Sequence, residues 1–125
     1  MTYLWVALGG ALGSVARYMF GIYAGRWFGT AFPWGTLLIN LGGSFLIGVF
    51  AESFALRWDT SQSTRAFLVV GICGGYTTFS TFSLDIVTLL NRGEVVAAGA
   101  YILASVFLAL AALYVGLHLV RAVLV

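Results

Sequence analysis

The residues best suited to chemistry are concentrated in one run, Gly71-Ile-Cys-Gly-Gly-Tyr-Thr-Thr-Phe-Ser-Thr-Phe-Ser83. Its glycine pair at 74–75 frees the backbone to leave regular helix, because glycine lacks the side chain that restricts φ and ψ. Five hydroxyl groups follow between residues 77 and 83, and they can bond to released backbone groups or to a ligand. A bilayer tolerates such an interruption only where protein covers it or where it lines a polar cavity. The run therefore predicts a site at membrane depth.

Further hydrogen-bond donors recur at helical spacing elsewhere in the chain. Thr36, Asn40 and Ser44 are four residues apart and share one helix face, as do Tyr101 and Ser105. These side chains either join helices, at about 1 kcal/mol per contact, or donate to a small anion that has lost its water. A cation pathway would instead require carboxylates along the helices.

Two aromatic residues and two serines extend this set of candidates. Phe79 and Phe82 are three residues apart, so their rings project from neighbouring faces of a helix. A phenyl ring has a negative face and a positive edge, and its edge can attract an anion without binding it tightly. On spacing alone, ordinary packing explains this pair better. Ser80 and Ser83 are further candidate donors.

The composition is that of an integral membrane protein. Of 125 residues, 62% are hydrophobic and 8% are charged, and a soluble domain of this size could not bury so much apolar surface. The six arginines are too few and too scattered for nucleic-acid binding. The chain is not expected to be an enzyme, because it has no paired carboxylates on one span, no cysteine and histidine constellation and no metal-ligand cluster.

The fold class expected is all-α, with four transmembrane helices in a single domain that covers residues 1–125. Spans of about 20 residues would lie near residues 4–23, 34–54, 66–90 and 95–119, and the third would be broken mid-membrane. Gly9 and Gly13 in the first span would let a neighbouring helix approach closely. All four tryptophans fall at predicted span ends, as in an aromatic belt: Trp5, Trp27, Trp34 and Trp58.

Three charged residues lie within the predicted spans. Arg17 either reaches the headgroups or places a cation at the mouth of an anion pathway. Glu52, near the far end of its span, is expected to reach the membrane interface. Asp85 follows the interruption, where an unpaired carboxylate would cost about 2.5–3.5 kcal/mol. We therefore expect Arg17 or the nearby hydroxyl groups to be its partner.

The arginines give no orientation signal. The two sides of the predicted bundle carry three each: Arg57, Arg65 and Arg121 against Arg17, Arg26 and Arg92. A balanced chain can insert both ways up, and two opposed copies can form a two-fold dimer. A single chain of four short helices could hardly enclose a path by itself. We therefore favour an antiparallel dual-topology homodimer over one fixed topology.

Two motifs resemble the Fluc/CrcB family of fluoride channels: Gly35-Thr-Leu-Leu-Ile-Asn40 and Gly74-Gly75-Tyr-Thr-Thr-Phe-Ser-Thr-Phe-Ser83. The resemblance covers nearly the whole chain, including its length and its glycine-rich first span. It implies an antiparallel homodimer in the cell inner membrane, with two pores through which fluoride leaves the cell passively.

The resemblance also implies roles for individual residues. Phe79 and Phe82 match paired pore phenylalanines, and Asn40 matches a pore asparagine that donates to the anion. The backbone carbonyls of Gly74 and Thr77 match those that hold a structural sodium ion at the dimer interface. The other matched positions are a polar track and a vestibule cation: Thr36, Tyr101, Ser105 and Arg17. The chain departs from the track at Ala109, where some relatives carry a hydroxyl.

Two other functions fit part of the sequence. A small dual-topology multidrug exporter can also have four spans, but it requires a carboxylate within the first span. Residues 4–23 contain none. An assembly subunit that transports nothing would have no need of the interruption at 74–75.

Overall fold

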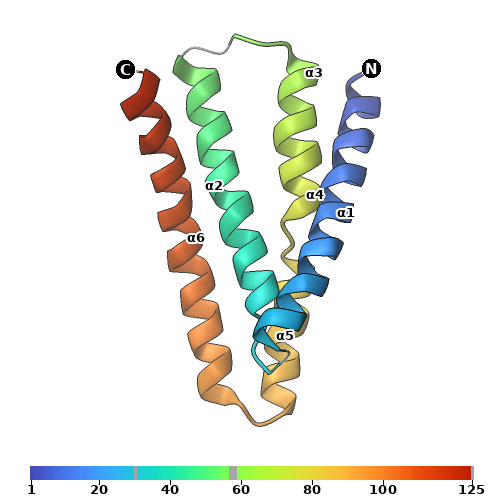
Figure 1. Ribbon diagram of the computed structural model, residues 1–125, viewed down its shortest axis with the longest axis vertical. Coiled ribbons are helices and arrows are strands. Elements are labelled where there is room, and N and C mark those ends of the chain that lie inside the picture. Colours follow the sequence, from blue (N-terminus) through green and yellow to red (C-terminus); the bar gives the residue numbers. More distant parts are fainter. Residues whose placement is uncertain (30, 57–58, 125) are drawn as a thin grey trace.

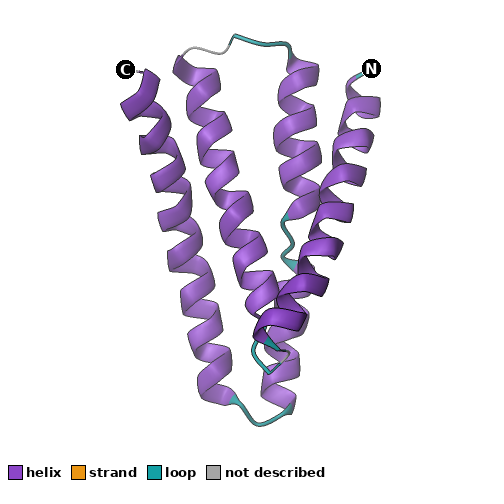
Figure 2. Ribbon diagram, viewed as in Figure 1, coloured by secondary structure: helices purple, strands orange, loops and turns teal. Residues whose placement is uncertain are grey.

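The computed structural model describes residues 1–29, 31–56 and 59–124. Arg57 and Trp58, which enter the orientation and aromatic-belt arguments, lie outside the described residues. The helices run side by side as long rods, with no strand in the described part of the chain (Figure 2). In chain order they are α1 (Thr2–Phe28), α2 (Trp34–Leu56), α3 (Gln62–Arg65), η1 (Ala66–Cys73), α4 (Gly74–Tyr76), α5 (Ser80–Asn91) and α6 (Val95–Leu124).

The molecule is elongated, and both ends of the chain lie at the same end of it (Figure 1). Both termini and the start of α3 lie at one end, whereas the connections from α1 to α2 and from α5 to α6 lie at the other (Figure 1). Within the described residues, three segments are long and apolar enough to cross a membrane, so this is a multi-pass membrane protein: Trp34–Leu56, Gln62–Asn91 and Val95–Leu124.

The first helix differs from these three segments. With 27 residues, α1 is long enough to span a bilayer. It is not among the described segments whose mean hydropathy is high enough for a membrane span. Its glycines and Arg17 lower the mean hydropathy. The count of four spans therefore stays a prediction.

The segment from 62 to 91 is not one regular helix. Its first half is π-helical over Ala66–Cys73, and α4 ends at Tyr76. Thr77 has extended backbone angles, φ −82° and ψ 158°, and α5 begins at Ser80. The helix is thus interrupted inside the glycine- and hydroxyl-rich run, at residues 77–79. The depth of this point in a bilayer stays a prediction.

Glycine contacts bring η1 and α4, the part of this segment before the interruption, against α1. The main neighbours of α1 are η1 and α4, and those of α2 are on α6. A Cβ at Gly75 would lie 2.6 Å from the Gly10 carbonyl oxygen, and one at Gly13 would overlap the Ile72 carbonyl. The prediction of a close helix contact on the glycine face of α1 is confirmed.

Glu52, which the sequence predicts to reach the membrane interface, is buried within the chain near the end of α2. It is 8% exposed, and its Oε2 accepts a hydrogen bond from Arg121 Nη2 at 2.9 Å. The glycines of the α2–α6 contact bring the two helices close enough for this pair: side chains at Gly48 and Gly116 would meet the opposite backbone. The ion pair therefore joins α2 to α6.

Candidate functional site

Asn40 of α2 is bonded to the backbone at the interruption. Its Nδ2 donates to the Thr78 carbonyl at 3.1 Å, and the Thr78 N–H donates to Asn40 Oδ1 at 2.9 Å. In an uninterrupted helix the Thr78 N–H would donate to the carbonyl of Gly74, four residues earlier. The asparagine therefore replaces the acceptor of the helix itself, and one of its two amide hydrogens is not used by these bonds.

A second side chain acts in the same way one turn later. The Thr81 N–H donates to Thr78 Oγ1 at 3.2 Å, whereas a regular helix would direct it to the Thr77 carbonyl. The carbonyls of Gly74 and Thr77 thus both lose their regular helical donors. The next carbonyl, that of Gly75, accepts from Arg17 Nε at 3.1 Å.

One hollow beside the interruption contains four of the predicted pore residues, Asn40, Phe79, Phe82 and Ser105, and we call it the phenylalanine groove. It has a volume of about 280 Å³. Its two phenyl rings are 5.5 Å apart and tilted by 48°. Phe79 is 78% exposed and Phe82 only 8%, so the groove is open to one side of the chain. Its other lining residues are Ser44, Ile47, Thr77, Thr78, Val106 and Ala109.

Ser105 has a particular position in this groove. Among the described residues, its Oγ is the buried side-chain oxygen or nitrogen that lacks a hydrogen-bond partner. An unpaired buried hydroxyl is unfavourable by about 1–3 kcal/mol. A ligand in the groove would give this hydroxyl a partner.

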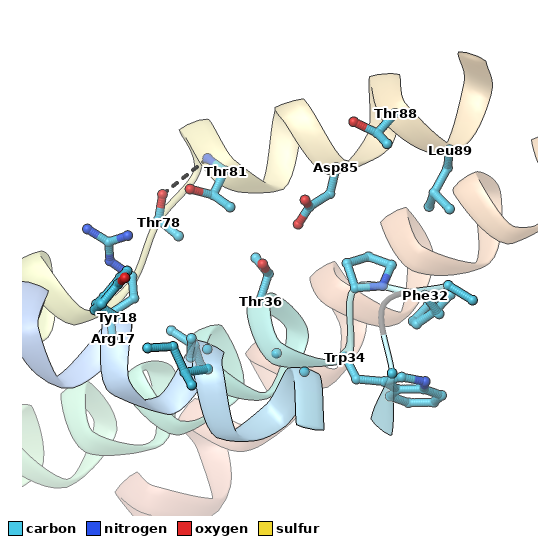
Figure 3. A pocket seen from close by; sticks show the side chains of 18 of the residues that line it. Arg17, Tyr18, Phe32, Trp34, Thr36, Thr78, Thr81, Asp85, Thr88 and Leu89 are labelled. Atoms are coloured by element: carbon cyan, nitrogen blue, oxygen red, sulfur yellow. Dashed lines mark hydrogen bonds between the residues drawn. The ribbon is translucent and has the colours of Figure 1, made fainter. Parts of the chain in front are cut away.

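A second, larger hollow of about 450 Å³ lies between α1, α2 and α5, and we call it the polar cavity. Figure 3 shows Thr36 and Asp85 pointing toward one another across it from α2 and α5, with Arg17 and Thr78 near one end. Thr78 lines both hollows, so the two meet at the interruption. The polar lining residues of the cavity are Arg17, Thr36, Thr78, Thr81, Asp85, Thr88 and Arg92.

Tyr101 of α6 lies between the two hollows. It is fully buried, its ring packs 5.1 Å from that of Phe82, and its hydroxyl donates to Asp85 Oδ2 at 3.1 Å. Of the two partners predicted for Asp85, Arg17 is wrong, and the partner is a hydroxyl group, but that of Tyr101 on α6 rather than one from the run at 77–83. Arg17 Nε donates instead to the Gly75 carbonyl at the interruption. Figure 3 shows the Arg17 and Asp85 side chains at different places along the cavity.

The two serines of α5 are placed away from both hollows. Ser80 and Ser83 are not among the residues described as lining the groove or the cavity. Ser83 Oγ donates to the Phe79 carbonyl at 3.0 Å, and Ser80 Oγ lies 3.2 Å from Thr78 Oγ1. Their hydroxyls therefore support the first turn of α5.

Sequence reasoning missed the α5 wall of the polar cavity. That wall is formed by residues 78, 81, 85, 88 and 92. Steps of three and four residues place such a series on one helix face. Thr78 and Thr81 were predicted only as members of the hydroxyl-rich run, and the spacing was the signal that could have added Thr88 and Arg92.

The chain was compared with known families and proteins. The model of the family described as CrcB-like protein, Camphor Resistance (CrcB), matches residues 4–117. A fluoride-specific ion channel FluC 1 of Nitrobacter hamburgensis is 64% identical over 116 residues, which cover 93% of this chain and 92% of the relative. A fluoride-specific ion channel FluC of Nitrobacter winogradskyi is 61% identical over 118 residues, or 94% of both chains. One of Rhodospirillum centenum is 51% identical over 116 residues, covering 93% and 92%.

Proposed function

This chain belongs to the CrcB-like protein family, and we propose that it is a passive fluoride-selective channel of the bacterial inner membrane rather than an enzyme. It would let fluoride leave the cell. The observation that supports the proposal most directly is the phenylalanine groove, in which two phenyl rings, an amide and an unpaired hydroxyl line one hollow.

The chemistry of the groove suits a small anion. Fluoride holds water strongly, so a dry path must supply donors that replace this water. The unused amide hydrogen of Asn40 and the hydroxyl of Ser105 are such donors, and the edges of Phe79 and Phe82 add partial positive charge. None of these groups is a full cation, so binding can be favourable enough for entry and weak enough for exit.

A second copy of the chain would complete the groove. Phe79 is 78% exposed in one chain, and Gly74 is also exposed, so one face of the interruption is uncovered. Lipid can cover an exposed apolar side chain, but non-helical backbone at membrane depth must be covered by protein or line a polar cavity. Together with the balanced arginines, this requirement supports an antiparallel dual-topology homodimer with two pores.

The residues at the interruption also fit a sodium ion. The carbonyls of Gly74 and Thr77 lose their helical donors to Asn40 Oδ1 and Thr78 Oγ1, and unwound backbone carbonyls are oxygen ligands of the kind that hold sodium in membrane proteins. Two opposed copies would supply four such oxygens. A sodium ion held there would offset the charge of nearby anions.

The polar cavity is the proposed vestibule. It contains Arg17, which the resemblance assigns to this role, and it meets the groove at Thr78. Thr36 and Tyr101 are proposed to belong to the part of the anion path that runs through the polar cavity. Thr36 lines this cavity, and Tyr101 bonds to Asp85 in its wall.

The proposal is tested by reconstituting the protein in liposomes and recording fluoride efflux with a fluoride electrode. Efflux well above that from empty liposomes is expected, whereas an equal rate would refute the channel. A multidrug exporter predicts proton-coupled uptake of a cationic dye. It has no support from α1, which carries no carboxylate between Thr2 and Phe28.

A further inference from the structure

We propose that Arg92 is a second cation of the anion pathway, placed at the outer end of the polar cavity, where it draws fluoride in from water. The inference rests on the proposed channel function. It adds a residue to the entry route that neither the sequence pattern nor the family match assigned.

The position of Arg92 follows from α5. Residues 78 to 92 line the cavity in steps of three and four, and the 12 helical residues of α5 between them extend for about 18 Å. Arg17 is held at the inner end of this wall by its bond to the Gly75 carbonyl. Arg92 follows the last residue of α5 and is exposed, so it stands where the cavity opens at the end of the molecule.

The charge of Arg92 is not neutralised by a bonded acid. Its side-chain hydrogen bond is a long one, from Nη1 to the Ala31 carbonyl at 3.4 Å. The salt bridge found in the described residues joins Arg121 to Glu52 near the opposite end, and Glu94 lines an adjoining hollow but is not among the residues that line the polar cavity. The guanidinium therefore keeps its charge and most of its donors for solvent anions.

The charged lining of the cavity consists of Arg17, Arg92 and Asp85. Two arginines face one carboxyl group, which is bonded to Tyr101, so basic side chains are in excess in the cavity, and the outermost of them is Arg92. A cation in a narrow mouth raises the local concentration of anions. Because the residue is exposed, salt screens this attraction, and an anion is not trapped.

The test compares Arg92→Gln with Arg26→Gln in the liposome efflux assay. Arg26 is a matched control: it is exposed in the last turn of α1 at the same end of the molecule, its guanidinium lies 5.9 Å from the Tyr23 ring, and it is not among the cavity residues. Arg92→Lys keeps the charge and tests for a purely structural effect.

We expect Arg92→Gln to lower the initial efflux roughly two- to threefold at about 10 mM of an impermeant salt, where the Debye length is about 30 Å. At about 1 M, where it is about 3 Å, the difference should disappear. Arg26→Gln and Arg92→Lys should remain near the wild type at both salt concentrations.

Three outcomes would overturn the inference: no reduction in Arg92→Gln at low salt, an equal reduction in Arg26→Gln, or a reduction that salt does not change. In each of these the wild type still conducts, so the proposed function stands. Wild-type efflux equal to that of empty liposomes would instead refute both proposals.

Discussion

Asn40 and Thr78 are joined by two hydrogen bonds that run in opposite directions, 3.1 Å to the carbonyl and 2.9 Å from the N–H. The side-chain amide thus bonds to both the N–H and the carbonyl of Thr78, as the backbone of a neighbouring strand would in a sheet. It ties the interruption to α2 and can still donate one hydrogen to an anion. Asn40 is therefore expected to serve structure and conduction together.

Replacing Asn40 with Ala should impair both roles. The backbone groups of Thr78 lose their partners, which should lower the free energy of unfolding by about 1–3 kcal/mol, and fluoride efflux should fall by more than about tenfold. Thermal unfolding in detergent and liposome efflux measure the two effects. Ser53→Ala is the control, because Ser53 lies on the same helix, is not among the residues that line the groove, and bonds to the Val49 carbonyl. Unchanged stability in Asn40→Ala would contradict the bracing role.

The two phenylalanines should separate conduction from packing. Phe79→Ile should reduce efflux with little loss of stability, because Phe79 is 78% exposed in the chain. Phe82→Ile should reduce efflux and also destabilise by about 1–2 kcal/mol, because that ring packs against Tyr101. Phe107→Ile, at a 65% exposed position on α6, is the control. Normal efflux in both groove variants would remove their assigned role.

Ser105→Ala should leave the protein at least as stable as the wild type and should lower its fluoride efflux. The change deletes a buried oxygen that has no partner, so unfolding should be unaffected or harder by up to about 1 kcal/mol. Efflux should fall several-fold, because the groove loses a donor. Ser53→Ala is the comparison, since its hydroxyl already bonds to the Val49 carbonyl at 2.7 Å. A clear loss of stability in Ser105→Ala would show that the hydroxyl has a structural partner.

Gly75→Ala should displace the interruption from α1. The added Cβ would lie 2.6 Å from the Gly10 carbonyl oxygen, and overpacking of this kind costs about 1–3 kcal/mol. Stability and efflux should fall together, and any dependence of stability on sodium in the buffer should weaken. Gly99→Ala, where a Cβ meets nothing within 4 Å, should be neutral or slightly stabilising. Equal behaviour of the two variants would argue against a constrained site.

The interruption and its contact with α1 could be predicted from sequence, because both depend on local composition. Gly74 and Gly75, followed by hydroxyl residues inside an apolar segment, leave few alternatives to an interrupted helix. The grouping of Phe79, Phe82 and Asn40 followed from the family resemblance rather than from spacing.

The side-chain pairs between helices could not be predicted in this way. The bonds from Tyr101 to Asp85, from Arg121 to Glu52 and from Arg17 to Gly75 depend on how each helix is rotated about its axis. Helices that are apolar all round carry no hydrophobic face that fixes this rotation. The sequence therefore identified most polar groups of the site without identifying their partners.

The π-helical turns of η1 have a consequence for changes in chain length. Each turn between Ala66 and Cys73 closes on the fifth residue instead of the fourth, so the segment holds one residue more than an α-helix of the same turns would need. Loss of one residue there could be absorbed by rewinding. Residues 77 to 83 contain no such extra residue, because each of them takes part in a hydrogen bond or a ring contact. Deletions should therefore be tolerated ahead of the interruption and not beyond it.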